Sequence, residues 1–155
     1  MTAFLRWEMK LAEKSHRKIE EFFRAELADA DFRLPEIYFY GGRFTHYLTS
    51  LLKIEGITIG RRIYIFPAKF WVSETQKLRL GEELVVHEIT HVLQYRREGF
   101  FKFLWLYLKS YAANLRRKKS WDFYARAEAY FEIPFEIEAR ACASKFVQWS
   151  KNRKI

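Results

Sequence analysis

The residues best able to do chemistry lie together at His87-Glu88-Ile89-Thr90-His91, an HExxH motif within a predicted helix over 80–99. At about 3.6 residues per turn, His87 and His91 share one face of that helix. Two neutral imidazoles so placed can both bind a tetrahedral Zn²⁺. Glu88, next to the first histidine, can take a proton from a zinc-activated water. The motif therefore predicts a catalytic zinc site.

A catalytic zinc site usually has three protein ligands and one open position. No histidine follows His91, which excludes a third histidine later in the chain. Two carboxylates remain in the final predicted helix, Glu136 and Glu138. Glu136 borders that helix's small and apolar face, over Ala139 and Ala143, whereas Glu138 lies beyond the opposite edge. We expect Glu136 to be the third ligand and keep Glu138 as the alternative.

The HExxH motif and Glu136 can each also be explained without a metal. HExxH occurs by chance in roughly one chain in a few hundred of this length, so its context must support it. Glu136 in a first helical turn would favour the positive end of the helix dipole and could pair with Arg140 at i,i+4. The buried, glycine-terminated helix around the motif favours the metal site.

The hydrophobic pattern predicts the elements that position these residues. We expect helices over 3–28, 80–99, 100–119 and 134–150, a short helix or turn over 121–130, and strands over 37–40 and 56–67. Gly60 inside the second strand suggests a bulge or a close backbone approach. Residues 44–53 fit strand or helix, and Ser73–Gln76 have the form of a capping box that opens a short helix. His16 is expected on the surface, and His46 in packing rather than in a ligand set.

The composition favours one domain over 1–155, with an α+β fold that is mostly helical and has a small sheet beside the HExxH helix. Half of the residues are hydrophobic, and the net charge is +9. A single cysteine, Cys142, excludes an internal disulfide. The charged start of the chain and the lack of a long apolar run predict a cytoplasmic protein without a signal peptide or membrane span.

The segment 100–119 combines an aromatic end with the basic block Arg116-Arg117-Lys118-Lys119. Such a helix could contact an anionic membrane surface, or could pack on the domain with its basic tip in water. Nucleic acid is a weaker expectation because no nucleic-acid module accompanies the block.

HExxH followed by E-x-x-A on a later helix, Glu136 to Ala139, resembles the gluzincin clan of zinc peptidases, and the chain combines it with the segments GITIGRRIYIFP, HEITHVLQYRREG and PFEIEARACA. More specifically, it is similar to the small metallopeptidase-like domain of extracellular contractile injection system core proteins. The resemblance covers about residues 55–146 and implies a minimal zincin-like fold. It also implies Glu136 as third ligand, Glu88 as general base, and strand 57–66 as an edge for an extended peptide. Arg140 departs from the Asp or Asn of many gluzincins and cannot accept a hydrogen bond from a ligand imidazole.

These features predict a zinc metalloprotease, a hydrolase of protein or peptide substrates. An oxyanion donor is also needed, and four residues between the ligands are candidates: Tyr111, Tyr124, Tyr130 and Arg126. The alternative is a non-catalytic zinc-stabilised domain that binds a protein partner or an anionic membrane surface. Oligomeric state does not follow from the sequence.

Overall fold

The computed structural model describes residues 7–42, 55–69, 71–72 and 78–153. The helices are α1 (Glu13–Glu26), α3 (Glu82–Glu98), α4 (Phe100–Lys118), α5 (Phe123–Phe131) and α6 (Pro134–Asn152), with a 3-10 turn at Pro67–Lys69. The strands are β1 (Trp7–Met9), β2 (Tyr38–Gly41), β3 (Gly56–Ile59), β4 (Arg62–Ile65), β5 (Trp71–Val72) and β6 (Leu78–Arg79). The fold is mostly helical α+β, as the sequence predicted.

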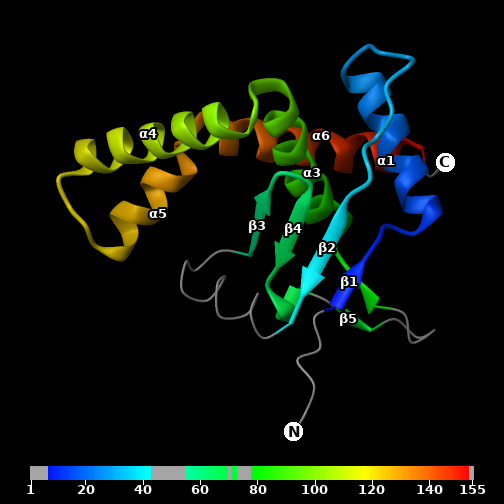
Figure 1. Cartoon of the computed structure of the whole chain (residues 1–155), viewed down its shortest axis with the longest axis horizontal. Coiled ribbons are helices and arrows are strands. Elements are labelled where there is room, and N and C mark those ends of the chain that lie inside the picture. The colour runs from blue at the N-terminus through cyan, green and yellow to red at the C-terminus, as the bar shows by residue number, and fades with distance from the viewer. Residues whose placement is uncertain (1–6, 43–54, 70, 73–77, 154–155) are drawn as a thin grey trace, which may run out of the picture.

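The main sheet lies beside α3 and below α6 in Figure 1, with strand order β1-β2-β4-β3. Strands β2 and β4 are parallel, and the other two pairs are antiparallel. The central core joins α1, the sheet, α3 and α6 through fully buried apolar side chains. Its largest members are Phe22, Phe23, Phe39, Phe146, Ile19, Ile63, Ile65 and Ile89. This core fixes α3 between the sheet and α6.

Helix α3 ends where the sequence predicted, at Gly99. This glycine has φ +82°, which L side chains rarely adopt, and its N–H donates to the Tyr95 carbonyl at 2.9 Å. The chain then turns directly into α4. The reversal brings the inner side of α4 beside the C-terminal half of α3.

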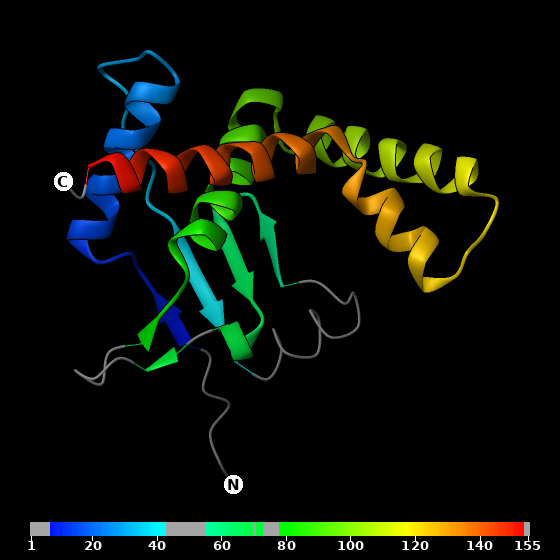
Figure 2. The ribbon, with the colours of Figure 1, turned by 180° about the vertical axis from the view of Figure 1, so that it is seen from behind.

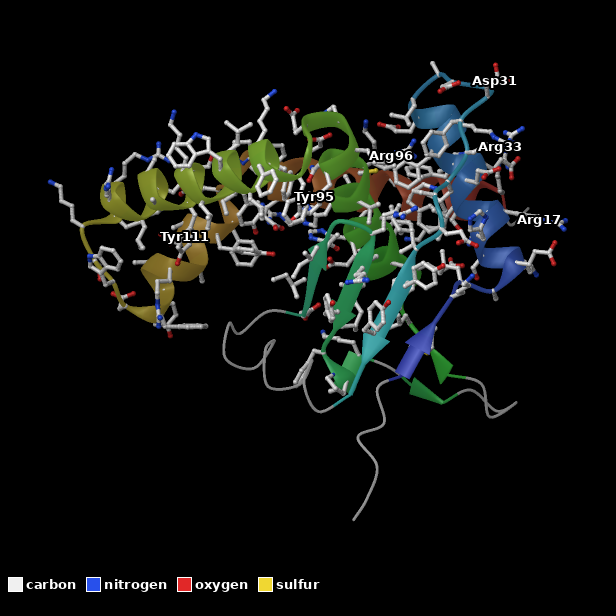
Figure 3. All side chains as sticks on the ribbon, viewed as in Figure 1. Arg17, Asp31, Arg33, Tyr95, Arg96 and Tyr111 are labelled. Carbon is white, nitrogen blue, oxygen red and sulfur yellow. The ribbon has the colours of Figure 1, made fainter. Side chains whose placement is uncertain are left out.

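Helices α4 and α5 form a hairpin that extends away from the sheet in both ribbon views (Figures 1 and 2). A small apolar cluster of Leu115, Ala125 and Ala129 joins the two helices, and the Asn114 side chain donates to the Ala129 carbonyl at 3.0 Å. Tyr111 lies between them (Figure 3). Asp122 caps α5 by accepting from the Ala125 N–H at 2.8 Å.

Two elements differ from prediction. The helix expected over 3–28 begins only at Glu13, because Trp7–Met9 pairs with β2 as an edge strand. The single strand expected over 56–67 is a hairpin of β3 and β4, turned at Gly60 with φ +63°. The close approach expected at Gly60 is also wrong, since a Cβ there would meet nothing within 4 Å. Apolar alternation continues across the two-residue turn, so periodicity alone did not reveal it.

Other predictions have different outcomes. The expected strand 37–40 and the helices 80–99, 100–119 and 134–150 are confirmed to within a few residues, and the short helix or turn expected over 121–130 is a helix. Residues 44–53 with His46, and the capping box Ser73–Gln76, lie outside the described residues. Among the helices of the described part, none is long and apolar enough to cross a membrane.

Candidate metal centre

Three of the predicted residues come together where α3 faces the start of α6. His87, His91 and Glu136 each offer one ligand atom, and these atoms all lie within 4.8 Å of one another. Pro134 occupies the first turn of α6 and starts the helix so that Glu136 falls in that turn. Glu136 is 2% exposed and His91 6%, so packing holds both side chains in place.

Taken pair by pair, the separations of the ligand atoms are close to the edge of a tetrahedral zinc site, although each histidine is nearest to a different oxygen of Glu136. The Nε2 atoms of His87 and His91 are 3.2 Å apart. Nε2 of His87 is 3.2 Å from Oε2 of Glu136, and Nε2 of His91 is 3.2 Å from Oε1. A tetrahedron with bonds of about 2.05 Å has edges of roughly 3.3 Å. The three residues therefore need little rearrangement to hold zinc.

The tautomer of His91 is set by Gln94, one turn later on α3. The Nδ1 of His91 lies 2.8 Å from Oε1 of Gln94. The amide NH₂ of Gln94 donates to the Phe135 carbonyl and to Glu138, each at 3.0 Å, so its oxygen faces the imidazole. Nδ1 of His91 is therefore the protonated nitrogen, and Nε2 keeps its lone pair for a metal.

This arrangement gathers electron-rich atoms that need a cation. Oε2 of Glu136 is buried and has no hydrogen-bond donor among the described residues. Burial opposes the charged form of His91, but contact with the Glu136 carboxylate outweighs it and raises the pKa of His91. Burial likewise opposes ionisation of Glu136, yet its contacts with His87 and His91 hold the pKa of that carboxyl well below its usual range. An anionic carboxylate facing two imidazoles matches a donor set that occurs in catalytic zinc sites.

Glu138, the alternative ligand, points away from this centre. Its carboxylate accepts two hydrogen bonds from Arg97, at 2.7 and 3.0 Å, and one from Gln94. Hydrogen bonding to Arg97 lowers the pKa of Glu138. Glu138 therefore supports Gln94, and the structure brings only Glu136 to the histidines.

Arg140 does not replace the missing acceptor for a ligand imidazole. Its guanidinium lies over the Phe131 ring, 5.0 Å from the ring centroid, and donates to the Phe131 carbonyl. The nearest contact with the centre is 3.9 Å, from Nη1 to Oε2 of Glu136. The acceptor is Gln94 instead, on the HExxH helix itself.

Glu88 lies beside the ligands in a pocket formed by β3. It is 3% exposed, and its Oε2 accepts a hydrogen bond of 2.6 Å from the Thr58 hydroxyl. A Cβ on Gly56 would lie 2.6 Å from Oε1 of Glu88. The glycine in β3 thus leaves the space that the carboxylate occupies, and burial raises the pKa of Glu88.

Two tyrosines from the hairpin complete the wall of the site. The Tyr107 hydroxyl of α4 donates to Oε1 of Glu136 at 2.7 Å. Tyr130 of α5 has a raised pKa because of burial first, and then because of the charges of Glu136 and Glu88. Of the four oxyanion candidates, only Tyr130 comes near the ligands. Tyr124 is 78% exposed, Arg126 is exposed, and Tyr111 packs between α4 and α5.

Sequence analysis missed four residues of the site: Gln94, Thr58, Gly56 and Tyr107. Gln94 follows His91 by three residues, so its place on the same helical face was readable from the spacing. The other three reach the site through contacts between elements distant in the chain, which no local pattern encodes.

Comparison with family models, with curated proteins and with solved structures gave no match to this chain. The similarity to gluzincins therefore stays a prediction from the residues.

Proposed function

We propose that this protein is a zinc-dependent hydrolase of peptide bonds, with zinc held by His87, His91 and Glu136. The supporting observation is that the ligand atoms of the three residues lie together, with pairwise separations of 3.2 Å, beside a buried carboxylate that is not itself a ligand. When bound, zinc would acidify a water molecule and polarise the scissile carbonyl.

Glu88 is the general base in this proposal. Its carboxylate interacts electrostatically with His91 and His87, and Thr58 holds it in one orientation. Burial raises its pKa, and its place beside the histidines lets it accept a proton from the attacking water and return one to the leaving amine. A structural zinc site has no need of a buried carboxylate in this position.

Tyr130 is the proposed donor to the developing oxyanion. A phenol is protonated near neutral pH, and burial raises the pKa of Tyr130 further, so its proton is available for a hydrogen bond. Tyr107 is already committed to Glu136, and its role is to hold that ligand.

A peptide is the proposed substrate because of the position of β3. Strand β3 is the last strand of the sheet. Among the described residues it pairs only with β4, so its other edge has no partner strand there. An extended peptide can add to such an edge through main-chain hydrogen bonds. Thr58 and Gly56 of this strand adjoin Glu88, so an added peptide would lie beside the base.

The second candidate is a non-catalytic zinc-stabilised domain. Its supporting observation is that the ligands join α3 to α6 and that Glu136 is almost fully buried. A metal there would tie the two helices together even without turnover. The two functions differ in what they require of Glu88.

The test uses Glu88→Gln, with Glu83→Gln as the control because Glu83 is an exposed residue of the same helix. Each protein is loaded with zinc and assayed on an unfolded protein and a peptide library. We expect Glu88→Gln to keep its zinc and lose at least ~100-fold in cleavage rate, the scale of a lost general base. Equal cleavage by both variants contradicts the proposal. A zinc-loaded wild type that cleaves nothing favours the non-catalytic domain.

A further inference from the structure

The outer face of α4 carries a row of apolar side chains in contact with solvent. Phe101 is 84% exposed, Trp105 66% and Leu108 61%. Their spacing of four and three residues, continued by exposed Ala112, places them on one face of the helix. The opposite face is buried, with Phe103 3% and Asn114 6% exposed. The exposed row is therefore not needed to hold the hairpin together.

A second row, of basic residues, runs along the first. Lys102, Lys109 and Arg116 recur every seven residues, and each is exposed. No acidic residue occurs from Gly99 to Trp121, whereas six lysines and arginines do. In the described part of the chain, neither Lys109 nor Arg116 makes an ion pair. Lys102 pairs with Glu98, with its Nζ 2.8 Å from Oε2. The uncompensated charge of the row therefore lies at Lys109 and Arg116, about 10 Å apart along the helix.

The two rows together have the chemistry of an interfacial helix. Aromatic and leucine side chains enter the boundary between headgroups and acyl chains, while long basic side chains reach the phosphates beside them. The hairpin projects away from the sheet (Figures 1 and 2), so its outer face can meet a flat surface. At the tip of the hairpin, Trp121 and Tyr124 are also 75% and 78% exposed.

We propose that the outer face of α4, defined by Phe101, Trp105, Leu108, Lys102, Lys109 and Arg116, docks the protein on a membrane surface rich in anionic lipids. Helix α4 itself has no acidic residue, and Lys109 and Arg116 beside the apolar row favour a negatively charged partner. A protein groove or a nucleic acid is disfavoured because the apolar and basic residues form parallel straight rows suited to a planar boundary.

Docking is independent of zinc chemistry. Tyr107, which contacts Glu136, lies on the inner side of α4. Substitutions in the outer face therefore leave the ligand cluster intact, and failure of the hydrolase proposal would not affect this one.

The test measures binding of the full chain to large unilamellar vesicles by co-sedimentation. One set is phosphatidylcholine alone, and the other contains phosphatidylglycerol as well. We expect binding to the anionic set to be at least about tenfold tighter, since each cation near such a surface adds roughly fivefold. The binding should weaken as salt is raised.

Two triple variants locate the surface. Lys102→Gln/Lys109→Gln/Arg116→Gln removes the basic row with a good helix former, and should weaken binding at least about tenfold. The charge-matched control, Lys14→Gln/Arg62→Gln/Lys151→Gln, changes exposed basic residues elsewhere and should change binding less than about twofold.

Phe101→Ser/Trp105→Ser/Leu108→Ser should also abolish most binding, with circular dichroism as the check on folding. Its control, Leu27→Ser/Ile59→Ser/Ile137→Ser, removes three other exposed apolar side chains. The proposal would be overturned by equal affinity for both vesicle sets or by no vesicle binding at all. It would also be overturned if a control variant lost as much binding as the α4 variant that it is matched to. A self-association or nucleic-acid binding that the same variants abolish while vesicles stay unbound would overturn it as well.

Discussion

The candidate metal centre and the outer face of α4 differ in the partners that their side chains have, although α4 belongs to both regions. In the centre, buried polar side chains are held by neighbouring polar groups, as Gln94 holds His91 and Thr58 holds Glu88. On the outer face, apolar side chains such as Trp105 are exposed and have no covering element among the described residues. A buried polar group without a partner is costly, so the centre must be preorganised. The outer face contributes little to folding and is free to serve binding.

The two faces of α4 should therefore differ most in their effect on stability. Phe103→Ala removes a buried ring that contacts Tyr95 and Phe135, and should lower the free energy of unfolding by about 3–5 kcal/mol. Trp105→Ala should change it by less than about 0.5 kcal/mol, as exposed substitutions do. Urea denaturation measures both. Comparable losses would mean that the outer face is part of the core.

Within the centre, Gln94→Ala should weaken zinc binding by about 10–100-fold, the range for loss of a partner that orients a ligand imidazole. The substitution removes the hydrogen bond to Nδ1 of His91, so neither the orientation of the ring nor its tautomer is fixed any longer. Arg96→Ala, exposed and two residues later on α3, is the control and should bind zinc normally. An unchanged affinity in Gln94→Ala would show that the hydrogen bond does not position His91.

Gly56→Ala should act on catalysis and not on zinc. The added Cβ would lie 2.6 Å from Oε1 of Glu88, a flexible carboxylate end that can shift without unfolding the strand. Misplacing the base should lower the cleavage rate by about tenfold while zinc affinity stays constant. Gly81→Ala is the matched control, because its Cβ would meet nothing within 4 Å. A normal rate in Gly56→Ala would remove Glu88 from the role of base.

The same contrast explains what the sequence could predict. His87, Glu88 and His91 were readable because helical spacing alone places their side chains, and Glu136 because its helical face could be compared with that of Glu138. The long helices were readable from their hydrophobic period. All of this is local information.

The errors arose where distant segments decide the structure. Trp7–Met9 has a helical pattern but pairs with β2, and the alternation over 56–67 hides the turn at Gly60. Tyr107 and Tyr130 reach Glu136 only because α4 and α5 fold back on α6. The exposure of Phe101 and Trp105 was equally hidden, because a hydrophobic pattern cannot show which face of an aromatic helix stays uncovered.

The most direct test of the metal centre is zinc affinity, measured by competition with a chromophoric chelator, for Glu136→Gln and Glu138→Gln. Both substitutions keep side-chain size and replace a carboxylate by an amide, and the two positions are two residues apart on α6. We expect Glu136→Gln to weaken zinc binding by more than about 100-fold, beyond the effect of losing a partner outside the ligand set. Glu138→Gln should weaken zinc binding by less than about tenfold, since it changes only a residue that hydrogen-bonds to Gln94. Zinc released by Glu138→Gln and retained by Glu136→Gln would contradict the proposed ligand set.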